Sequence, residues 1–158
     1  MNEQEFAERL ASEKCMLEAW GNFISSKVRA CLKSELGDRY KGFLKMEANP
    51  RVKDLNSALN KAFVVKAGKY NHPYEDMEDK VGVRFVVLLN SHVDCVARAI
   101  ESSAQGAWLF SKDLDYESKK SKKPNEFDKY QSLHYVLRSI EDFDFEGVTV
   151  KSNTPCEV

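Results

Sequence analysis

The chain has 158 residues, with 24 Lys and Arg against 25 Asp and Glu and a formal net charge of −1. This length predicts one domain with a core large enough to fold alone, and the balanced charge does not indicate a general nucleic-acid or membrane surface. No apolar run approaches the roughly 20 residues of a membrane span, and the polar, acidic N-terminus does not resemble a signal peptide.

The cysteines and histidines do not predict a metal site. The chain has four widely separated cysteines, Cys15, Cys31, Cys95 and Cys156. No two of them form a Cys-x-x-Cys pair. The spacing favours free thiols in a reducing cytoplasm over a zinc site or a disulfide framework. The three histidines lack metal-ligand spacing, and no adjacent His-Asp pair indicates a metal hydrolase.

Residues 1–37 are predicted to form an N-terminal helical segment, because apolar residues recur near helical spacing throughout it. Gly21-Asn22 is a candidate point for a split into two helices, and Gly37-Asp38 is expected to end the segment. The remaining residues, 38–158, are assigned to the core of the same single domain. This core is expected to begin with a short strand over residues 40–46 and a break at Asn49-Pro50.

Residues 51–61 predict a helix with one basic face. Asp54 is a suitable N-cap, and the expected buried stripe consists of Leu55, Ala58, Leu59, Ala62 and Phe63. A spacing of four residues separates Lys53, Ser57 and Lys61, which brings two ammonium groups and a hydroxyl together near a helix N-terminus. This arrangement suits phosphate oxygens. The alternative is a solvated basic face.

Residues 78–89 combine a turn with an apolar, β-branched run that predicts a buried strand from Val81. Asp79 is expected in the turn that enters the strand, and Gly82 allows close backbone approach. Burying an unpaired guanidinium is costly, so Arg84 should have a partner or open onto a wet cleft. Asp79 and Arg84 are five residues apart, and residues at this spacing in one strand would point to opposite faces. This spacing is the reason for placing Asp79 in the turn. An ion pair between Asp79 and Arg84 at the strand end is the other interpretation.

The second half of the chain predicts further strands around one helix. Ser91 is expected to cap a helix that runs to about residue 105, with an inward face formed by Val93, Val96, Ala97 and Ile100. A strand over residues 108–110 follows, and then a charged loop over residues 114–128 that carries the basic run 119–123. Residues 141–146 read as an acidic turn region between later strands, which are expected over residues 148–151 and 154–158.

Residues 130–137 predict a strand whose alternation places Tyr130, Ser132 and His134 on one face. An aromatic ring, a hydroxyl and an imidazole on one face could stack on and hydrogen-bond a base. A strand-end tyrosine and a histidine with a local partner are the simpler alternative.

The order of these motifs resembles the RelA/SpoT-type (p)ppGpp synthetase domain, in the manner of a small alarmone synthetase. The matching motifs, between residues 51 and 158, are Arg-x-Lys-x-x-x-Ser-x-x-x-Lys, Asp-x-x-Gly-x-Arg, Lys-Asp, Tyr-Gln-Ser-Leu-His and Glu-Val. The resemblance implies an α+β fold, a mixed β-sheet flanked by helices that is nucleotidyltransferase-like. It also implies a GTP pyrophosphokinase, which transfers pyrophosphate from ATP to the 3′-hydroxyl of GDP or GTP and yields (p)ppGpp and AMP.

The resemblance further implies a role for each matching residue. Arg51 and Arg84 match the arginines that sandwich the ATP adenine. The phosphates of ATP would be bound by Lys53, Ser57 and Lys61. Mg²⁺ would be held by Asp79, and Glu157, the second acidic residue, would hold the metal or accept the proton of the attacking hydroxyl. The acceptor nucleotide would meet Lys112, Lys123, Asn125, Tyr130 and His134, with Tyr130 stacking on the guanine.

The sequence departs from the family pattern mainly on the acceptor side. Lys129 replaces the usual glycine before the stacking tyrosine, residues 126–128 are additional, and Leu114 replaces the tyrosine that usually follows Lys-Asp. The acceptor therefore stays open. Toxin-type members pyrophosphorylate the 3′ end of tRNA, and here the basic run would hold the nucleic-acid backbone. A third alternative is a catalytically inactive nucleotide-binding or interaction module.

The family's Glu-x-Gln-x-Arg-Thr strand is cut after Glu157-Val158. We therefore expect the chain to be a piece of a longer protein, or a truncated member of the family. The resemblance leaves open whether a longer parent forms a homo-oligomer.

Overall fold

The computed structural model describes residues 1–112 and 132–158. The predicted charged loop and the start of the following strand lie outside the described residues. The candidate acceptor residues Lys123, Asn125 and Tyr130 are among them.

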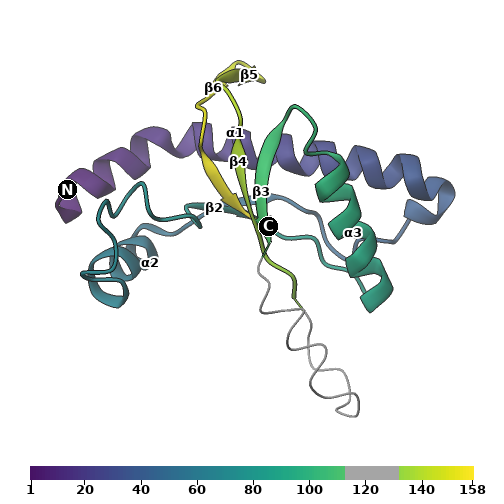
Figure 1. The fold of residues 1–158 in the computed structure, drawn as a ribbon, viewed down its shortest axis with the longest axis horizontal. Helices are drawn as coiled ribbons and strands as arrows, with labels where there is room; N and C mark the ends of the chain where they lie inside the picture. Colours follow the sequence, from purple (N-terminus) through teal and green to yellow (C-terminus); the bar gives the residue numbers. More distant parts are fainter. Residues whose placement is uncertain (113–131) are drawn as a thin grey trace, which may run out of the picture.

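One helix of 34 residues, α1 (Glu3–Leu36), runs along the long axis of the molecule (Figure 1). A capping box starts it, with the Asn2 side chain accepting from the Glu5 N–H and the Glu5 carboxylate accepting from the Asn2 N–H. Gly37 ends it with a φ of 53°. The buried stripe consists of Phe6, Leu10, Leu17, Ala19, Trp20, Gly21, Ile24, Ser25, Val28 and Leu32.

The candidate split at Gly21 is wrong, because this glycine serves packing. A Cβ atom at Gly21 would lie 2.4 Å from Cβ of Pro50, so only a glycine lets the first strand come this close to the helix. The helix therefore continues through Gly21 without a break.

Within the described residues, five strands form a mixed sheet in the order β1-β2-β7-β4-β3. These are β1 (Pro50–Val52), β2 (Val81–Val83), β7 (Pro155–Glu157), β4 (Tyr135–Ser139) and β3 (Trp108–Lys112). Neighbours pair antiparallel except β2 and β7, which run parallel. The prediction of an α+β architecture with a mixed sheet flanked by helices is confirmed.

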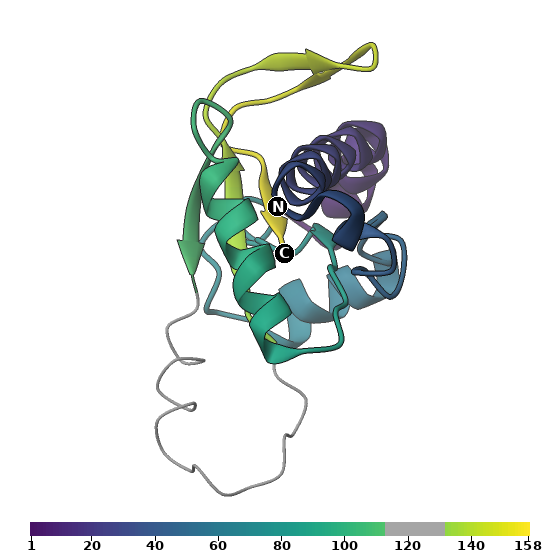
Figure 2. The ribbon, with the colours of Figure 1, turned by 90° about the vertical axis from the view of Figure 1, so that its right-hand side faces the viewer.

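The core lies between the sheet and the helices α1 and α3 (Asn90–Ser102), which also pack against each other (Figure 2). Val81 and Val83 of β2, Tyr135 and Leu137 of β4, and Cys156 of β7 are all almost completely buried. Val96, Ala97 and Ile100 of α3 are buried as predicted. Burial raises the pKa of the Cys156 thiol, which marks it as an inert core residue.

Residues predicted as an acidic turn region instead contain a strand. β5 (Phe143–Phe145) and β6 (Val148–Val150) form a hairpin beside α1, and the φ angles of 51° at Glu146 and 80° at Gly147 build its turn. The ring of Phe23 in α1 lies 4.6 Å from that of Phe143 and 5.4 Å from that of Phe145. Packing of these rings outweighs the acidic residues that punctuate the segment.

The short elements between α1 and β2 differ most from prediction. Residues 40–46 do not form a strand: η1 (Gly37–Tyr40) is a 3-10 turn, and the following residues are turns and bends. Pro50 starts β1 at the sheet edge, where its missing N–H costs no ladder bond, so the predicted break is the beginning of a strand. Asp54 caps α2 (Leu55–Leu59) as predicted, and a π-helical turn, η2 (Asn60–Val65), follows directly.

Three predicted details are wrong. Leu55, predicted for the buried stripe of the second helix, is 41% exposed. Ser91 lies inside α3, whose N-cap position is Leu89 without a capping side chain. The strand that begins at Val81 ends at Val83, so Arg84 follows the strand instead of lying within it.

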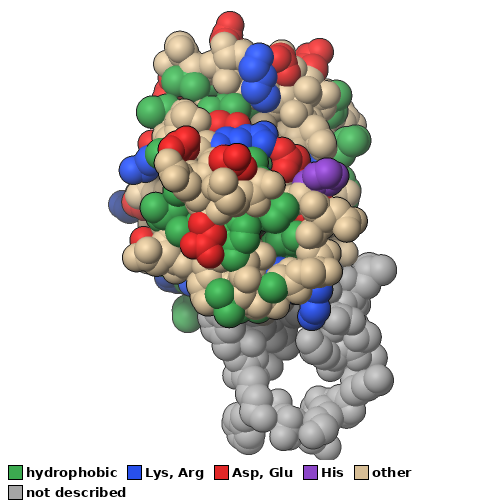
Figure 3. Space-filling model, turned by 90° about the vertical axis from the view of Figure 1, so that its left-hand side faces the viewer, with side chains coloured by type: hydrophobic (Ala, Val, Ile, Leu, Met, Phe, Trp, Pro, Cys, Tyr) green, Lys and Arg blue, Asp and Glu red, His purple; other side chains and the backbone are tan. Residues whose placement is uncertain are grey.

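On the face shown in Figure 3, acidic and basic side chains lie beside one another, in keeping with the nearly balanced composition. Among the helices of the described residues, none is both long and apolar enough to cross a membrane.

Candidate functional site

One row of residues crosses the sheet on the face that points away from α1. Arg51 lies opposite Gly82, Gly82 opposite Glu157, and Glu157 opposite Val136. Directly paired residues project from the same face of a sheet, so Arg51 and Glu157 share a face with only a glycine between them. The buried valines on either side of Gly82 point the other way, into the core.

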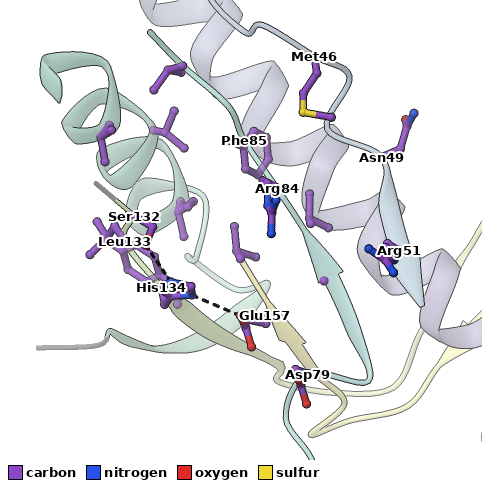
Figure 4. A pocket seen from close by; sticks show the side chains of 18 of the residues that line it. Met46, Asn49, Arg51, Asp79, Arg84, Phe85, Ser132, Leu133, His134 and Glu157 are labelled. Atoms are coloured by element: carbon purple, nitrogen blue, oxygen red, sulfur yellow. Dashed lines mark hydrogen bonds and ion pairs between the residues drawn. The ribbon is translucent and has the colours of Figure 1, made fainter. Parts of the chain in front are cut away.

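This row borders a cavity of about 720 Å³. Figure 4 shows Arg51 and Arg84 on one side of the cavity, with Glu157 and His134 across from them and Asp79 at one end. Its polar lining includes Arg51, Lys53, Ser57, Asp79, Arg84, Ser132, His134 and Glu157. Its apolar lining comes from the end of β2, from α3 and from β4. Most of the predicted site residues within the described chain therefore converge on one cavity.

Asp79 is bound by two lysines. It lies in the turn before β2, as predicted, and its Oδ2 atom accepts from Lys53 Nζ at 2.9 Å and from Lys61 Nζ at 2.6 Å. Lys53 follows β1, whereas Lys61 comes from η2. Within the described residues Asp79 thus pairs with lysines and not with Arg84, so the interpretation as a strand-end Asp79–Arg84 pair is wrong.

The two lysines set the charge state of this carboxylate. Burial by itself raises the pKa of Asp79, but hydrogen bonds and charge from Lys61 and Lys53 outweigh it, and the pKa lies below its usual value. Burial lowers the pKa of Lys61, but Asp79 raises it above its usual value. The shifts of Asp79 and Lys61 both favour the charged forms, so this pair is ionised at neutral pH.

The second oxygen of Asp79, Oδ1, is buried and has no hydrogen-bond partner among the described residues, a costly state unless a cation or water reaches it. Mg²⁺ takes one or two carboxylates and completes its shell with phosphate oxygens and water. Asp79 and Glu157 fit that donor set. Residues 1–112 and 132–158 hold no cluster of three His, Cys, Asp or Glu side chains that could form an all-protein metal site.

The turn that carries Asp79 is anchored on both sides. The Glu78 carboxylate accepts from Arg138 of β4 at 2.6 Å, and the Lys80 carbonyl accepts from the Lys53 N–H at 2.8 Å. The side chain of Lys80 is almost completely buried, and its ammonium donates to the carbonyls of Tyr74 and Met77. These contacts fix the position of Asp79 relative to the sheet.

His134 connects two residues that are far apart in the sequence. Its Nδ1 lies 3.3 Å from Glu157 Oε1, and its Nε2 lies 3.1 Å from Ser132 Oγ (Figure 4). Tyr135 and Leu137 are buried, as the alternation predicts, but β4 begins only at Tyr135, so Ser132 and His134 precede the strand in which they were predicted to lie. The contact with Glu157 depends on the register of β4 with β7, which the sequence does not reveal.

Comparisons of the chain with protein-family models, with curated proteins and with solved structures found no match.

Three residues predicted to bind ligand do not simply project into the cavity. Ser57 lines the cavity, but its backbone N–H and its hydroxyl both contact the N-cap Asp54. Lys61 reaches the site through Asp79 and is not itself among the described lining residues. Lys112, at the end of β3, is not among the lining residues; its Nζ lies 3.7 Å from Glu101 Oε1 and 5.8 Å from the centre of the Tyr135 ring.

Sequence reasoning missed Lys80 as a supporting residue. Its neighbours, a carboxylate before it and an apolar run after it, are compatible with either a solvated or a buried lysine. Only the fold shows that two carbonyls of residues 74–77 converge on its ammonium. As a whole, the site offers cations for an anionic ligand, two carboxylates for a divalent metal, and two arginines for a flat ring or further anionic groups.

Proposed function

We propose that the chain is a GTP pyrophosphokinase of the RelA/SpoT type, which transfers the pyrophosphoryl group of ATP to the 3′-hydroxyl of GDP or GTP. The observation that carries the proposal is the Asp79 cluster: one carboxylate held by Lys53 and Lys61, in the same cavity as Arg51, Arg84 and Glu157. The motif order resembles that family, and the cavity brings the matching residues together.

The arrangement of lysines and arginines suggests where each part of the donor ATP would bind. Its triphosphate would lie against Lys53 and Lys61, whose ammonium groups would exchange part of their contact with Asp79 for phosphate oxygens. Its adenine would lie between the guanidinium groups of Arg51 and Arg84, where stacking on a planar cation needs no buried counter-ion. Arg84 is exposed and lines the cavity, as the sequence requires of an arginine beside an apolar run.

The reaction needs charge neutralisation and alignment more than covalent chemistry from the protein. The acceptor 3′-oxygen attacks the β-phosphorus of ATP, the bond from that phosphorus to the oxygen of the α-phosphate breaks, and AMP leaves. The hydroxyl proton passes to the Glu157 carboxylate, which His134 orients through its Nδ1 contact. Mg²⁺, when held by Asp79 and Glu157, would neutralise phosphate charge. Lys53 and Lys61 balance the remaining charge on the polyphosphate.

The acceptor side rests on the resemblance more than on described geometry. Lys123, Asn125 and Tyr130 lie outside the described residues, and His134 and Lys112 are the acceptor candidates within them. GDP and GTP are proposed as acceptors on this basis. Transfer to the 3′ end of tRNA is kept as an outcome of the test.

The test is an assay with ATP labelled in the γ-phosphate, incubated with Mg²⁺ and separately with GDP, GTP or tRNA. We expect label in ppGpp or pppGpp with stoichiometric AMP, and no product without an acceptor or in the presence of EDTA. Label in tRNA alone would show that the acceptor is tRNA and not GDP or GTP. Nucleotide-dependent thermal stabilisation without any product would indicate a binding module instead of an enzyme.

Two substitutions test the site. Asp79→Asn and Glu157→Gln should each lower the rate about 100-fold or more, because each removes a charge that acts on the phosphates or the attacking hydroxyl. The matched controls are Asp144→Asn and Glu141→Gln, exposed acids outside the cavity lining, and they should keep the wild-type rate. Full activity in both site variants would show that the catalytic site lies elsewhere.

A further inference from the structure

Gly82 is a glycine that the fold does not require. Its φ lies outside the left-handed region that favours glycine, and it occupies the middle of the regular strand β2. A Cβ atom there would meet only the Glu157 carbonyl oxygen, at 3.4 Å, which is an ordinary van der Waals contact. Gly21 provides the contrast, because its missing Cβ is what allows the contact with Pro50.

Glycine inside a strand is unfavourable by backbone entropy and by the loss of a side chain to pack. The commonest compensations are a bulge, a close backbone contact or a ligand that approaches the strand. Gly82 is paired in regular register with Arg51, which argues against a bulge, and the Cβ contact argues against backbone crowding. The ligand remains, and Gly82 does line the cavity.

The surroundings of Gly82 indicate which part of a ligand comes close. Arg51 is directly opposite Gly82 on β1, and Arg84 follows Gly82 by two residues, just beyond the end of β2. Both arginines line the cavity beside Gly82. A flat ring held between the two guanidinium groups would place its edge over the Gly82 backbone.

We infer that Gly82 is a specificity-determining residue, whose missing side chain leaves room for the purine ring of the donor nucleotide between Arg51 and Arg84. The inference rests on the proposed function, because it names the part of ATP that meets this strand. A side chain at residue 82 projects from the same face as Arg51 and Glu157 and occupies the space of the ring. The lysines proposed to bind the phosphates contact Asp79 and belong to other elements than β2.

The inference separates binding of the base from binding of the phosphates. Isothermal titration would compare α,β-methylene ATP, which lacks the cleavable bond, with inorganic triphosphate, which lacks the base. For Gly82→Ala we expect a several-fold loss of affinity for the ATP analogue, and for Gly82→Val a loss of tenfold or more. Affinity for triphosphate should stay within twofold of wild type in both variants.

Thermal unfolding of the same proteins checks that they fold. We expect an unchanged or higher Tm for Gly82→Val, because a β-branched residue suits a strand better than glycine does. A purely structural role for Gly82 would instead lower the Tm and weaken both ligands together. Ser111→Val is the matched control, since it adds the same side chain to the same row of the sheet at a residue outside the cavity lining.

The outcomes are distinguishable. If the wild-type protein binds the ATP analogue and Gly82→Val binds it equally well, the inference is wrong while the proposed function stands. If Gly82→Val loses both ligands in proportion, the inference is also wrong. A wild-type protein that binds neither ligand would overturn the proposed function and, with it, this role of Gly82.

Discussion

At the scale of single residues, Lys80 is a buried cation beside the site. Its ammonium donates to the carbonyls of Tyr74 at 2.6 Å and Met77 at 2.7 Å and lies 4.6 Å from the centre of the Tyr74 ring. The Tyr74 hydroxyl in turn donates to Glu13 of α1 at 2.8 Å. Lys80 thus ties the loop before β2 to the first helix, and Asp79 is its immediate neighbour.

Lys80 should give the stability of the protein a dependence on alkaline pH. Burial lowers its pKa from 10.5 to about 8. Between these values the unfolded chain holds a proton that the folded protein has released, so the free energy of unfolding rises with pH in this window. At 1.4 kcal/mol per pKa unit, the rise is at most about 3 kcal/mol. Its hydrogen bonds to carbonyls favour the ammonium and reduce that figure.

The measurement is urea unfolding of wild type and Lys80→Met, followed by circular dichroism from pH 7 to pH 10.5. We expect the stability of wild type relative to Lys80→Met to increase above pH 8, because only the wild type has this group to deprotonate. The exposed Lys69→Met should instead follow wild type at every pH. Parallel curves for wild type and Lys80→Met would contradict the prediction.

At the scale of elements, the contact between α1 and β1 depends on Gly21. Alanine is the better helix former by about 1 kcal/mol, but its Cβ would lie 2.4 Å from Cβ of Pro50. Overpacking of this kind typically costs about 1–3 kcal/mol and here exceeds the gain in propensity. We expect Gly21→Ala to lower the Tm by several degrees, measured by differential scanning calorimetry. The exposed neighbour Asn22→Ala should leave the Tm unchanged or raise it.

Elements with a long repeating pattern could be predicted from the sequence, and short ones could not. The apolar stripes of α1 and α3, and the alternation around Tyr135, extend over enough residues to show their period. β1 and β5 have three residues each, which is too few for a period, and their pairing comes from distant contacts. The role of Gly21 cannot be read from its neighbours in the sequence either, because it depends on contact with Pro50.

At the scale of the whole molecule, β7 joins two strand pairs. β1 pairs with β2, and β3 pairs with β4, but within the described sheet only β7 links these pairs, through β2 on one side and β4 on the other. β7 also supplies Glu157 to the cavity and the buried Cys156 to the core.

We therefore expect a chain that ends at residue 154 to lose cooperative unfolding and nucleotide-induced stabilisation together. Without β7 the sheet splits, and Leu137 loses its partner Cys156. Removing residues 1–4 instead should shorten α1 by less than one turn and keep a single thermal transition, because these residues are exposed. Chemical denaturation and proteolysis of both shortened chains would check this. A cooperative transition in the chain without β7 would contradict it.

The sequence predicts which residues form the site, but it does not predict which of their side chains contact one another. The spacing of Lys53 and Lys61 and the motif around Asp79 name residues that do meet. The contact of Lys53 with Asp79 and that of His134 with Glu157 follow from the pairing of strands far apart in the sequence, and the contact of Lys61 with Asp79 follows from the position of η2 beside that turn. Such register is set by the packing of the whole sheet, which no local pattern contains.

The position of β7 also has a consequence for synthesis of the protein. A chain leaves the ribosome from its N-terminus, so α1 and the two strand pairs emerge before the strand that unites them. Until residues 155–157 are free of the exit tunnel, the nascent chain exposes unpaired edges of β2 and β4. The cavity is then also without Glu157. Ligand binding and completion of the sheet therefore become available to the nascent chain at the same moment.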